Sequence, residues 1–231
     1  FLIKLMAITA IRTFFNKITA ENVDYITKDV PIIFTANHPN TMMDPMIIGY
    51  TCKRKLHFFA KSTLFNNMIA GWFLRRNQIV PVYRKVDDPS KMDQNKETFS
   101  KGYEILKQNK AFLIFPEGIS TGDRKLSQIK TGAARIGFGA EAENDWQLGV
   151  QIIPVGLNYT NAIKFRSDVS TRFGQPIQLT DFRDVYERDE KEAVHLVTEQ
   201  IETALSKLTI NLKDLEMQEI VEALERIYKQ E

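Results

Sequence analysis

The chain has 231 residues, 43% of them hydrophobic, with 31 Lys/Arg against 29 Asp/Glu. This length and apolar content supply the core of one domain, or of one domain with an appended helical segment, and exclude an intrinsically disordered chain. The single cysteine excludes an internal disulfide, and none of the 3 histidines has a second His or a Cys at metal-ligand spacing, so we expect no metal site and a cytoplasmic environment.

The small net charge hides an asymmetry along the chain. Residues 1–85 hold 12 Lys/Arg and 4 Asp/Glu, whereas residues 86–231 hold 19 and 25. A basic first part indicates an anionic partner such as phosphate, nucleic acid or a lipid headgroup surface. An ordinary solvated surface would have the same composition. The aromatic residues lie within apolar runs rather than among the basic residues, so no nucleic-acid partner is expected.

The first predicted element is a cationic amphipathic helix over residues 1–18. Its sequence, FLIKLMAITAIRTFFNKI, combines apolar residues at helical spacing with basic residues and no acidic one. Such a helix suits the interface of an anionic membrane, although the same pattern is typical of a helix that packs on its own domain. No run reaches the roughly 18–20 apolar residues of a membrane-spanning helix, so this segment is expected to be peripheral. Because the chain begins at Phe1 rather than Met, we expect it to be an excised segment, and spans outside it stay open.

Short β-rich runs then alternate with helical patterns. The predicted strands cover residues 31–36, 55–60, 79–83, 111–115, 150–157 and 169–174. The predicted helices cover residues 45–53, 63–75, 92–109 and 129–142, and a helical segment begins near residue 186. This alternation favours an α/β fold with a mostly parallel twisted sheet flanked by helices. The expected organisation is an amphipathic helix over 1–20, an α/β domain over 21–180 and a helical C-terminal segment over 181–231.

Polar clusters follow three of the predicted strands, at residues 37–44, 83–88 and 116–124. In open α/β sheets, ligands bind beyond the carboxyl ends of the strands, in the loops that follow. The three clusters therefore predict one shared site at that edge of the sheet.

The first cluster contains a candidate general base. His38 and Asp44 are separated by five residues. A carboxylate that accepts from one imidazole nitrogen fixes the tautomer and stabilises the cationic ring, so the other nitrogen can remove a proton from an alcohol. A His in a turn followed by an Asp at a helix N-cap would give the same pattern, and Asn37 and Asn40 would suit such a turn.

The other clusters contain candidate phosphate ligands. Glu117 and Gly118 follow a strand and precede Ser120 and Arg124. Such a loop can surround a phosphate with backbone N–H groups, a hydroxyl and a guanidinium. It lacks the Gly-Lys-Ser/Thr ending of a P-loop, which disfavours nucleotide hydrolysis. Arg84 ends another strand, where it suits a bidentate phosphate clamp. A surface ion pair with the adjacent aspartates, Asp87 and Asp88, is the alternative for Arg84.

Taken in order, four blocks of this sequence resemble the four blocks of the phospholipid/glycerol acyltransferase family, which includes lysophosphatidate and glycerol-3-phosphate acyltransferases. The blocks are NHPNTMMDP, the strand-end Arg84, FPEGIS and IIPVGLNY. The resemblance covers about residues 30–177. The five residues between His38 and Asp44, where the common spacing is four, are similar to a subgroup resembling fungal glycerol-3-phosphate and dihydroxyacetone-phosphate acyltransferases.

The resemblance implies a role for each block. His38 and Asp44 would be the base and its partner. The acceptor phosphate would bind Arg84 and the third-block residues Glu117, Gly118 and Ser120, and the fourth-block residues Ile153 and Pro154 would shape the acyl or acceptor pocket. Two departures stand out. The usual Gly and Phe before the second-block Arg are Gln78 and Pro81, and the usual EGTR reads EGIS, so that Arg124 or Lys130 is expected to replace the missing arginine.

The predicted function is O-acyl transfer in phospholipid biosynthesis. The donor would be acyl-CoA or acyl carrier protein, the acceptor a glycerol-phosphate-type hydroxyl compound, and no further cofactor is expected because no metal cluster or dinucleotide fingerprint occurs. The chain is expected on the cytoplasmic face of a membrane with an anionic surface. The rival interpretation is a catalytically silent lipid-binding or membrane-tethering domain of the same fold, against which the intact His38 and Asp44 weigh.

Overall fold

The computed structural model describes residues 2–76, 79–83, 95–120, 126–210 and 221. Eight strands within these residues form one sheet in the order β1-β7-β6-β2-β5-β3-β4, with β8 paired to β6. The strands are β1 (Lys17–Glu21), β2 (Ile32–Ala36), β3 (Leu56–Lys61), β4 (Ile79–Val82), β5 (Ala111–Ile114), β6 (Gln151–Tyr159), β7 (Asp168–Phe173) and β8 (Ile177–Gln178). The predicted α/β fold with a mostly parallel sheet is confirmed.

Two strand pairs depart from the parallel arrangement. β7 and β8 both run antiparallel to β6, whereas β6, β2, β5, β3 and β4 are parallel to their neighbours in that series. β7 follows β6 after a short loop, and strands joined in this way return antiparallel because a parallel connection needs a long crossover. β1 pairs with β7 and forms the edge of the sheet.

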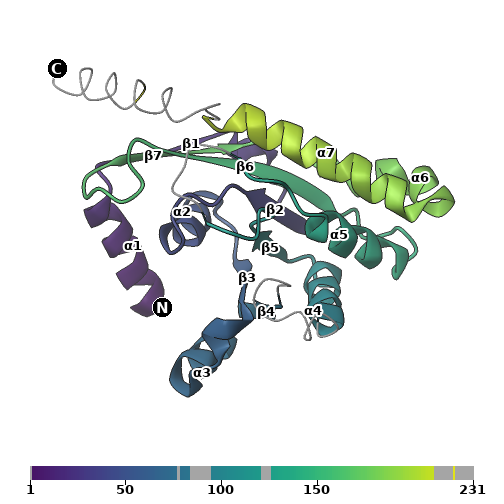
Figure 1. Ribbon diagram of the computed structural model, residues 1–231, viewed down its shortest axis with the longest axis horizontal. Coiled ribbons are helices and arrows are strands. Elements are labelled where there is room, and N and C mark those ends of the chain that lie inside the picture. Colours follow the sequence, from purple (N-terminus) through teal and green to yellow (C-terminus); the bar gives the residue numbers. More distant parts are fainter. Residues whose placement is uncertain (1, 77–78, 84–94, 121–125, 211–220, 222–231) are drawn as a thin grey trace.

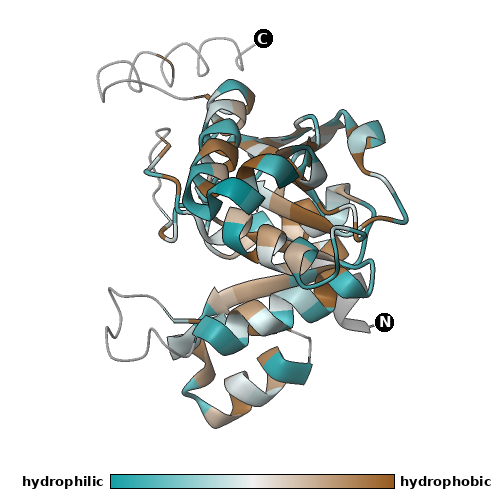
Figure 2. Ribbon diagram, turned by 90° about the vertical axis from the view of Figure 1, so that its right-hand side faces the viewer, coloured by the Kyte–Doolittle hydropathy of each residue, from teal (hydrophilic) through white to brown (hydrophobic). Residues whose placement is uncertain are grey.

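Helices cover both faces of the sheet (Figure 1). The α-helices are α1 (Leu2–Phe14), α2 (Met43–Thr51), α3 (Met68–Arg76), α4 (Asn95–Lys107), α5 (Gly132–Ala142), α6 (Arg183–Arg188) and α7 (Glu190–Leu208). Short 3-10 turns occur at η1 (Val23–Tyr25), η2 (Ser62–Phe65) and η4 (Leu179–Phe182). Figure 2 shows hydrophobic strands enclosed between helices that carry many hydrophilic residues.

The core consists of two apolar clusters, one on each face of the sheet. Ile33 packs with residues of α4, α5 and α7, whereas its neighbour Phe34 packs with residues of α1 and α2. Successive side chains of a strand point to opposite faces, so a strand covered by helices on both sides reads as a continuous apolar run. All five residues of β2 are buried for this reason. β2 therefore holds the loop that follows it firmly in the middle of the fold.

The N-terminal prediction was wrong in its extent. α1 ends at Phe14 rather than near residue 18, and Lys17–Glu21 form strand β1, so a boundary at residue 20 falls inside the sheet. The sequence KITAE has polar residues at alternate positions, as expected of a half-exposed edge strand. Such a short, polar sequence has a low β-propensity and so gives only a weak indication of a strand. Ile11 and Phe15 are buried in the core, as the domain-packing alternative predicts. None of the helices within the described residues is long and apolar enough to cross a bilayer.

The predicted C-terminal helical segment is present as far as residue 208. α7 begins after Asp189, whose carboxylate accepts from the backbone N–H groups of Lys191 and Glu192. This N-cap satisfies two of the four donors that a helix start leaves unpaired. α7 then lies along β6 (Figure 1). The rest of the predicted segment, residues 211–231, lies outside the described residues apart from residue 221.

Candidate active site

The carboxyl ends of the central strands bring the predicted site loops together. β2 pairs in parallel with both β5 and β6, so the three strands end at the same edge of the sheet. The loop with His38 follows β2, and the loop with Glu117 follows β5. β6 continues beyond the end of β2, because Ala36 is in register with Val155 and β6 extends to Tyr159. The last residues of β6 therefore flank the His38 loop.

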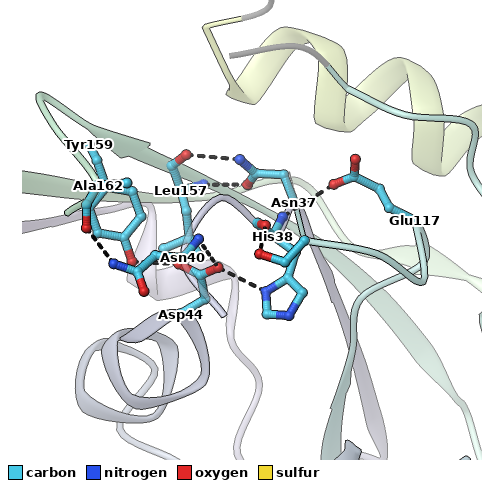
Figure 3. Close-up of polar contacts among 9 residues, drawn as sticks. Asn37, His38, Asn40, Asp44, Glu117, Leu157, Tyr159 and Ala162 are labelled. Atoms are coloured by element: carbon cyan, nitrogen blue, oxygen red, sulfur yellow. Dashed lines mark hydrogen bonds and ion pairs between the residues drawn. The ribbon is translucent and has the colours of Figure 1, made fainter. Parts of the chain in front are cut away.

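His38 and Asp44 form a close pair (Figure 3). Nδ1 of His38 lies 2.8 Å from Oδ2 of Asp44, and the histidine side chain is 14% exposed while the aspartate is fully buried. Asp44 lies in the first turn of α2, which starts directly after the loop. With the carboxylate accepting from Nδ1–H, the proton-free nitrogen is Nε2, on the opposite side of the ring. The pair thus presents a basic nitrogen on the side of the ring away from Asp44.

Asp44 is held by two further hydrogen bonds. The backbone N–H of Asn40 donates to Oδ2 at 2.8 Å, and the hydroxyl of Tyr159 donates to Oδ1 at 2.6 Å. Burial raises the pKa of Asp44, and the hydrogen bonds from His38, Tyr159 and Asn40 oppose that rise. Burial and the neighbouring Asp44 charge raise the pKa of Tyr159, which therefore remains a proton donor. Both carboxylate oxygens are oriented before any substrate binds.

The His38 loop is fixed to its neighbours on three sides. The side-chain amide of Asn37 donates to the carbonyl of Leu157 at 3.0 Å and accepts from its N–H at 2.7 Å, extending the pairing of β6. The side-chain amide of Asn40 donates to the carbonyl of Ala162. The His38 ring stacks on Phe115, with centroids 3.7 Å apart and planes 12° from parallel. The imidazole is thereby held in one orientation.

The loop after β5 contacts the His38 backbone directly. Glu117 is 5% exposed; its Oε1 accepts from the N–H of His38 at 3.2 Å, and its Oε2 accepts from the N–H of Ser127 at 2.8 Å. The hydroxyl of Ser120 donates to the carbonyl of His38 at 2.7 Å. These bonds link the loops after β2 and β5 into a single unit.

Gly118 allows a cation to approach this loop. Its φ is +71°, a conformation that favours glycine, and a Cβ at this position would collide with Nζ of Lys130. The backbone N–H of Lys130 donates to the carbonyl of Pro116 at 2.9 Å, which fixes the lysine beside the turn. An ammonium group therefore lies against the Glu117–Ser120 turn.

The predicted site residues divide into three groups. His38, Asp44, Glu117, Gly118, Ser120 and Lys130 gather at the carboxyl edge. Arg84 and Arg124 lie outside the described residues. Ile153 and Pro154 lie inside β6, buried and in register with Phe34 and Thr35 of β2.

Sequence reasoning missed Tyr159 and Phe115, and it treated Asn37 and Asn40 only as turn residues. Tyr159 continues the alternation of Ile153, Val155 and Leu157, which all face the same core cluster. One further step of that period would have included it. The stacking of Phe115 on His38 joins residues that are far apart in the chain and had no local signal.

Comparison with known proteins finds acyltransferases among the relatives of this chain. Relatives include glycerol-3-phosphate O-acyltransferase 2 of Saccharomyces cerevisiae, 32% identical over 136 residues, which are 58% of this chain and 18% of that protein. The 1-acyl-sn-glycerol-3-phosphate acyltransferase of Streptococcus pneumoniae is 28% identical over 81% of this chain and 64% of its own length. The chain thus spans about a fifth of the yeast relative's length.

The same fold occurs in a solved structure. The crystal structure of the 1-acyl-sn-glycerophosphate (LPA) acyltransferase PlsC from Thermotoga maritima matches with a TM-score of 0.61 at 22% identity, over 89% of this chain and 78% of that one. A model of the family described as Acyltransferase matches residues 17–158. Since that match includes most of the sheet and both loops that meet at His38, the chain belongs to the acyltransferase family.

Proposed function

We propose that the chain transfers a fatty acyl group from a thioester donor to a hydroxyl of a glycerol-phosphate-type acceptor in phospholipid biosynthesis. The observation that carries this proposal is the His38–Asp44 pair, with Nδ1 and Oδ2 2.8 Å apart and Nε2 on the side of the ring away from the aspartate. An alcohol needs a positioned base to attack a thioester at neutral pH, and an imidazole with a carboxylate partner is suited to that task. Family membership and the relatives' names support the same reaction.

The proposed reaction is a direct transfer. Nε2 of His38 takes the proton of the acceptor hydroxyl while the hydroxyl oxygen bonds to the thioester carbonyl carbon. The tetrahedral intermediate collapses, the C–S bond breaks, and the leaving thiolate takes the proton back from His38. The products are an ester and a free thiol. Asp44 stabilises the imidazolium that forms between the two steps.

The acceptor phosphate is proposed to bind the turn after β5. Lys130 supplies a cation beside Gly118, which accords with its role as a replacement for the arginine absent from EGIS. Ser120 borders the same turn, and Arg84 and Arg124 remain proposed ligands from outside the described residues. Glu117 is proposed to position the two loops rather than touch phosphate, because both of its oxygens accept backbone N–H groups and a carboxylate repels an anion.

Further parts of the proposal concern the donor and the location. Acyl-CoA and acyl carrier protein are both proposed donors, and no additional cofactor takes part in the reaction as written. Ile153 and Pro154 are proposed to shape the acyl or acceptor pocket. The proposed location is the cytoplasmic face of a membrane with an anionic surface, with α1 near it. Only the exposed side of α1, which includes Met6, is proposed to face the membrane, because Ile11 is buried in the core.

An acceptor panel tests the function. Glycerol 3-phosphate, dihydroxyacetone phosphate and 1-acyl-glycerol 3-phosphate would each be incubated with labelled acyl-CoA and the chain. We expect one or more labelled esters, and His38→Ala should lower turnover about 100-fold or more. His195→Ala is the matched control, because His195 is an exposed histidine on α7 whose loss should leave turnover unchanged.

Two outcomes would contradict the proposal. Activity of His38→Ala within threefold of the unmodified chain would remove the general base. Lipid binding without turnover on any of the three acceptors would support the catalytically silent lipid-binding domain instead.

A further inference from the structure

A short projection of the fold exposes large apolar side chains. We use the name projection for residues 62–76, which form η2 and α3. Leu64, Met68, Ile69 and Trp72 are 53%, 87%, 80% and 66% exposed. Figure 1 shows α3 at the opposite end of the molecule from α7, beyond β3 and β4. Soluble surfaces carry scattered apolar residues, but four large ones on consecutive turns mark an interaction site.

The projection is an ordered element with its apolar side turned outward. Oδ1 of Asn67 accepts from the N–H groups of Ile69 and Ala70, both at 3.0 Å, and so caps the start of α3. Gly71 is the buried residue of α3, and a Cβ there would lie 2.6 Å from the carbonyl oxygen of Phe65. The helix therefore packs on η2 through its smallest residue. Its largest apolar residues point away from the domain.

The sequence that contains the projection is basic. Residues 45–86 contain eight Lys/Arg and no Asp/Glu. Arg75 and Arg76 are exposed in the last turn of α3, where cations also suit the helix dipole. The Arg75 guanidinium lies 5.4 Å from the centroid of the Phe65 ring. An exposed apolar helix that carries a tryptophan and ends in two arginines has the chemistry of a segment that lies in an anionic bilayer surface.

The topology relates the projection to the active site. β3 runs parallel to β5, and β5 runs parallel to β2, so all three end at the same edge of the sheet. η2 begins directly after β3, as the loops with Glu117 and His38 begin after β5 and β2. The projection therefore lies at the same edge of the sheet as the loops where the proposed acyl transfer takes place. A partner that binds the projection would lie near that edge.

We propose that the projection inserts its apolar side into the surface of an anionic lipid bilayer, with Leu64, Met68, Ile69 and Trp72 among the acyl chains and Arg75 and Arg76 at the lipid phosphates. A bilayer fits better than a protein partner because an exposed apolar helix that ends in two arginines needs no matching pocket. This inference rests on the proposed function in one respect, namely that the acyl product is a lipid that must leave into a membrane.

The first experiment measures binding to vesicles. The 231-residue chain would be sedimented with vesicles of phosphatidylcholine containing phosphatidylglycerol. Ile69→Ser/Trp72→Ser should weaken binding at least tenfold, whereas Leu196→Ser should leave it unchanged. Leu196 is the matched control because it is an exposed apolar residue on α7, away from the projection. Arg76→Gln should weaken binding less and reduce its dependence on the anionic lipid.

A second measurement reports on the projection itself. The chain has 2 tryptophans, so Trp146→Phe leaves Trp72 as the only indole. Its emission should shift to shorter wavelength when anionic vesicles are added. An unshifted emission, or binding of Ile69→Ser/Trp72→Ser within twofold of the unmodified chain, would overturn the proposal. A lipid-free dimer that Ile69→Ser/Trp72→Ser converts to a monomer would also overturn it and assign the surface to a second copy.

Failure of this inference is distinguishable from failure of the proposed function. Turnover with a short, water-soluble acceptor in the absence of vesicles tests the chemistry alone. We expect Ile69→Ser/Trp72→Ser to keep that turnover while losing vesicle binding. A chain that binds vesicles through the projection but transfers no acyl group would retain the inference about the surface and reject the function.

Discussion

The His38 and Glu117 loops follow β2 and β5, and the projection follows the neighbouring strand β3. The two regions differ in how far their side chains are shielded from solvent. At the edge, both oxygens of the buried Asp44 and both of Glu117 accept hydrogen bonds, and the His38 ring is stacked on Phe115. In the projection, Met68 and Ile69 have most of their surface in solvent. The side chains of the first region are covered by mutual contacts, whereas the second exposes its large apolar side chains.

This difference separates the expected effects of substitution. A residue at the edge contributes to its neighbours' positions, so its loss should alter stability or catalysis in the isolated chain. A residue exposed in the projection has little contact to lose, so its loss should alter only what binds there. The following predictions test that separation.

The largest effect on stability is expected from Phe15, a core residue that packs against Tyr159. Phe15 is 2% exposed and its ring centroid lies 5.7 Å from that of Tyr159. Phe15→Ala should lower the free energy of unfolding by about 3–5 kcal/mol because it leaves a cavity in the core. Trp72→Ala removes a larger ring and should cost less than about 0.5 kcal/mol. Urea denaturation of both variants would measure this, and equal losses would contradict the comparison.

Lys130 should affect acceptor binding. If its ammonium group binds the acceptor phosphate, Lys130→Ala removes a charge-assisted hydrogen bond of about 1.5–3 kcal/mol and should raise the acceptor KM about tenfold or more. The donor KM is the internal control. Lys101→Ala is the matched variant, because Lys101 pairs with Glu97 on the surface of α4. A change of the same size in both KM values would contradict a phosphate role for Lys130.

Tyr159 should affect turnover more than binding. Its hydroxyl donates to Asp44 Oδ1 at 2.6 Å, so Tyr159→Phe leaves a buried carboxylate oxygen without that bond. The loss should lower kcat by about tenfold, equivalent to about 1.4 kcal/mol, while acceptor KM stays the same. Tyr186→Phe, in the aromatic cluster around Phe138, serves as the control. An unchanged kcat in Tyr159→Phe would show that Asp44 is oriented without the phenol.

Asp44→Asn should change stability by an amount that depends on pH. Burial raises the folded-state pKa of Asp44 above its unfolded value, which is about 3.9. The stabilising contribution of the protonated group is complete below that value and is lost as the pH rises through the folded pKa. Asp44→Asn should therefore have a higher Tm than the unmodified chain at pH 7. One kcal/mol corresponds to about 2–4 °C for a chain of this size.

Thermal unfolding of both forms from pH 7 down to about pH 4 would check this sign. The difference in Tm should shrink towards acid pH, as Asp44 becomes increasingly protonated in both the folded and the unfolded state. Turnover of Asp44→Asn should be strongly impaired at every pH, because an amide orients the imidazole without stabilising its charge. A lower Tm at pH 7 would show that the ion pair with His38 outweighs the cost of burial.

The sequence by itself determined the main strands and the members of the proposed catalytic pair. Apolar runs such as 31–36 and 111–115 are strands because buried parallel strands are apolar on both sides, a property visible in consecutive residues. The first block contains both His38 and Asp44. Residues six apart, one after a strand and the other in the first turn of the next helix, have few ways to lie far from each other. The strands and the His38–Asp44 pair could be predicted because both depend on residues that are close together in the sequence.

Only the tertiary structure decided which partners complete the site and which faces stay open. Tyr159 meets Asp44 across 115 residues, and Glu117 meets His38 across 79, so their contacts depend on the order of β2, β5 and β6 in the sheet. The same spacing of apolar residues predicted α1 and α3, yet Ile11 is buried and Ile69 is 80% exposed. Helical periodicity specifies that a helix has an apolar side, whereas the packing of distant elements determines whether the chain itself covers that side.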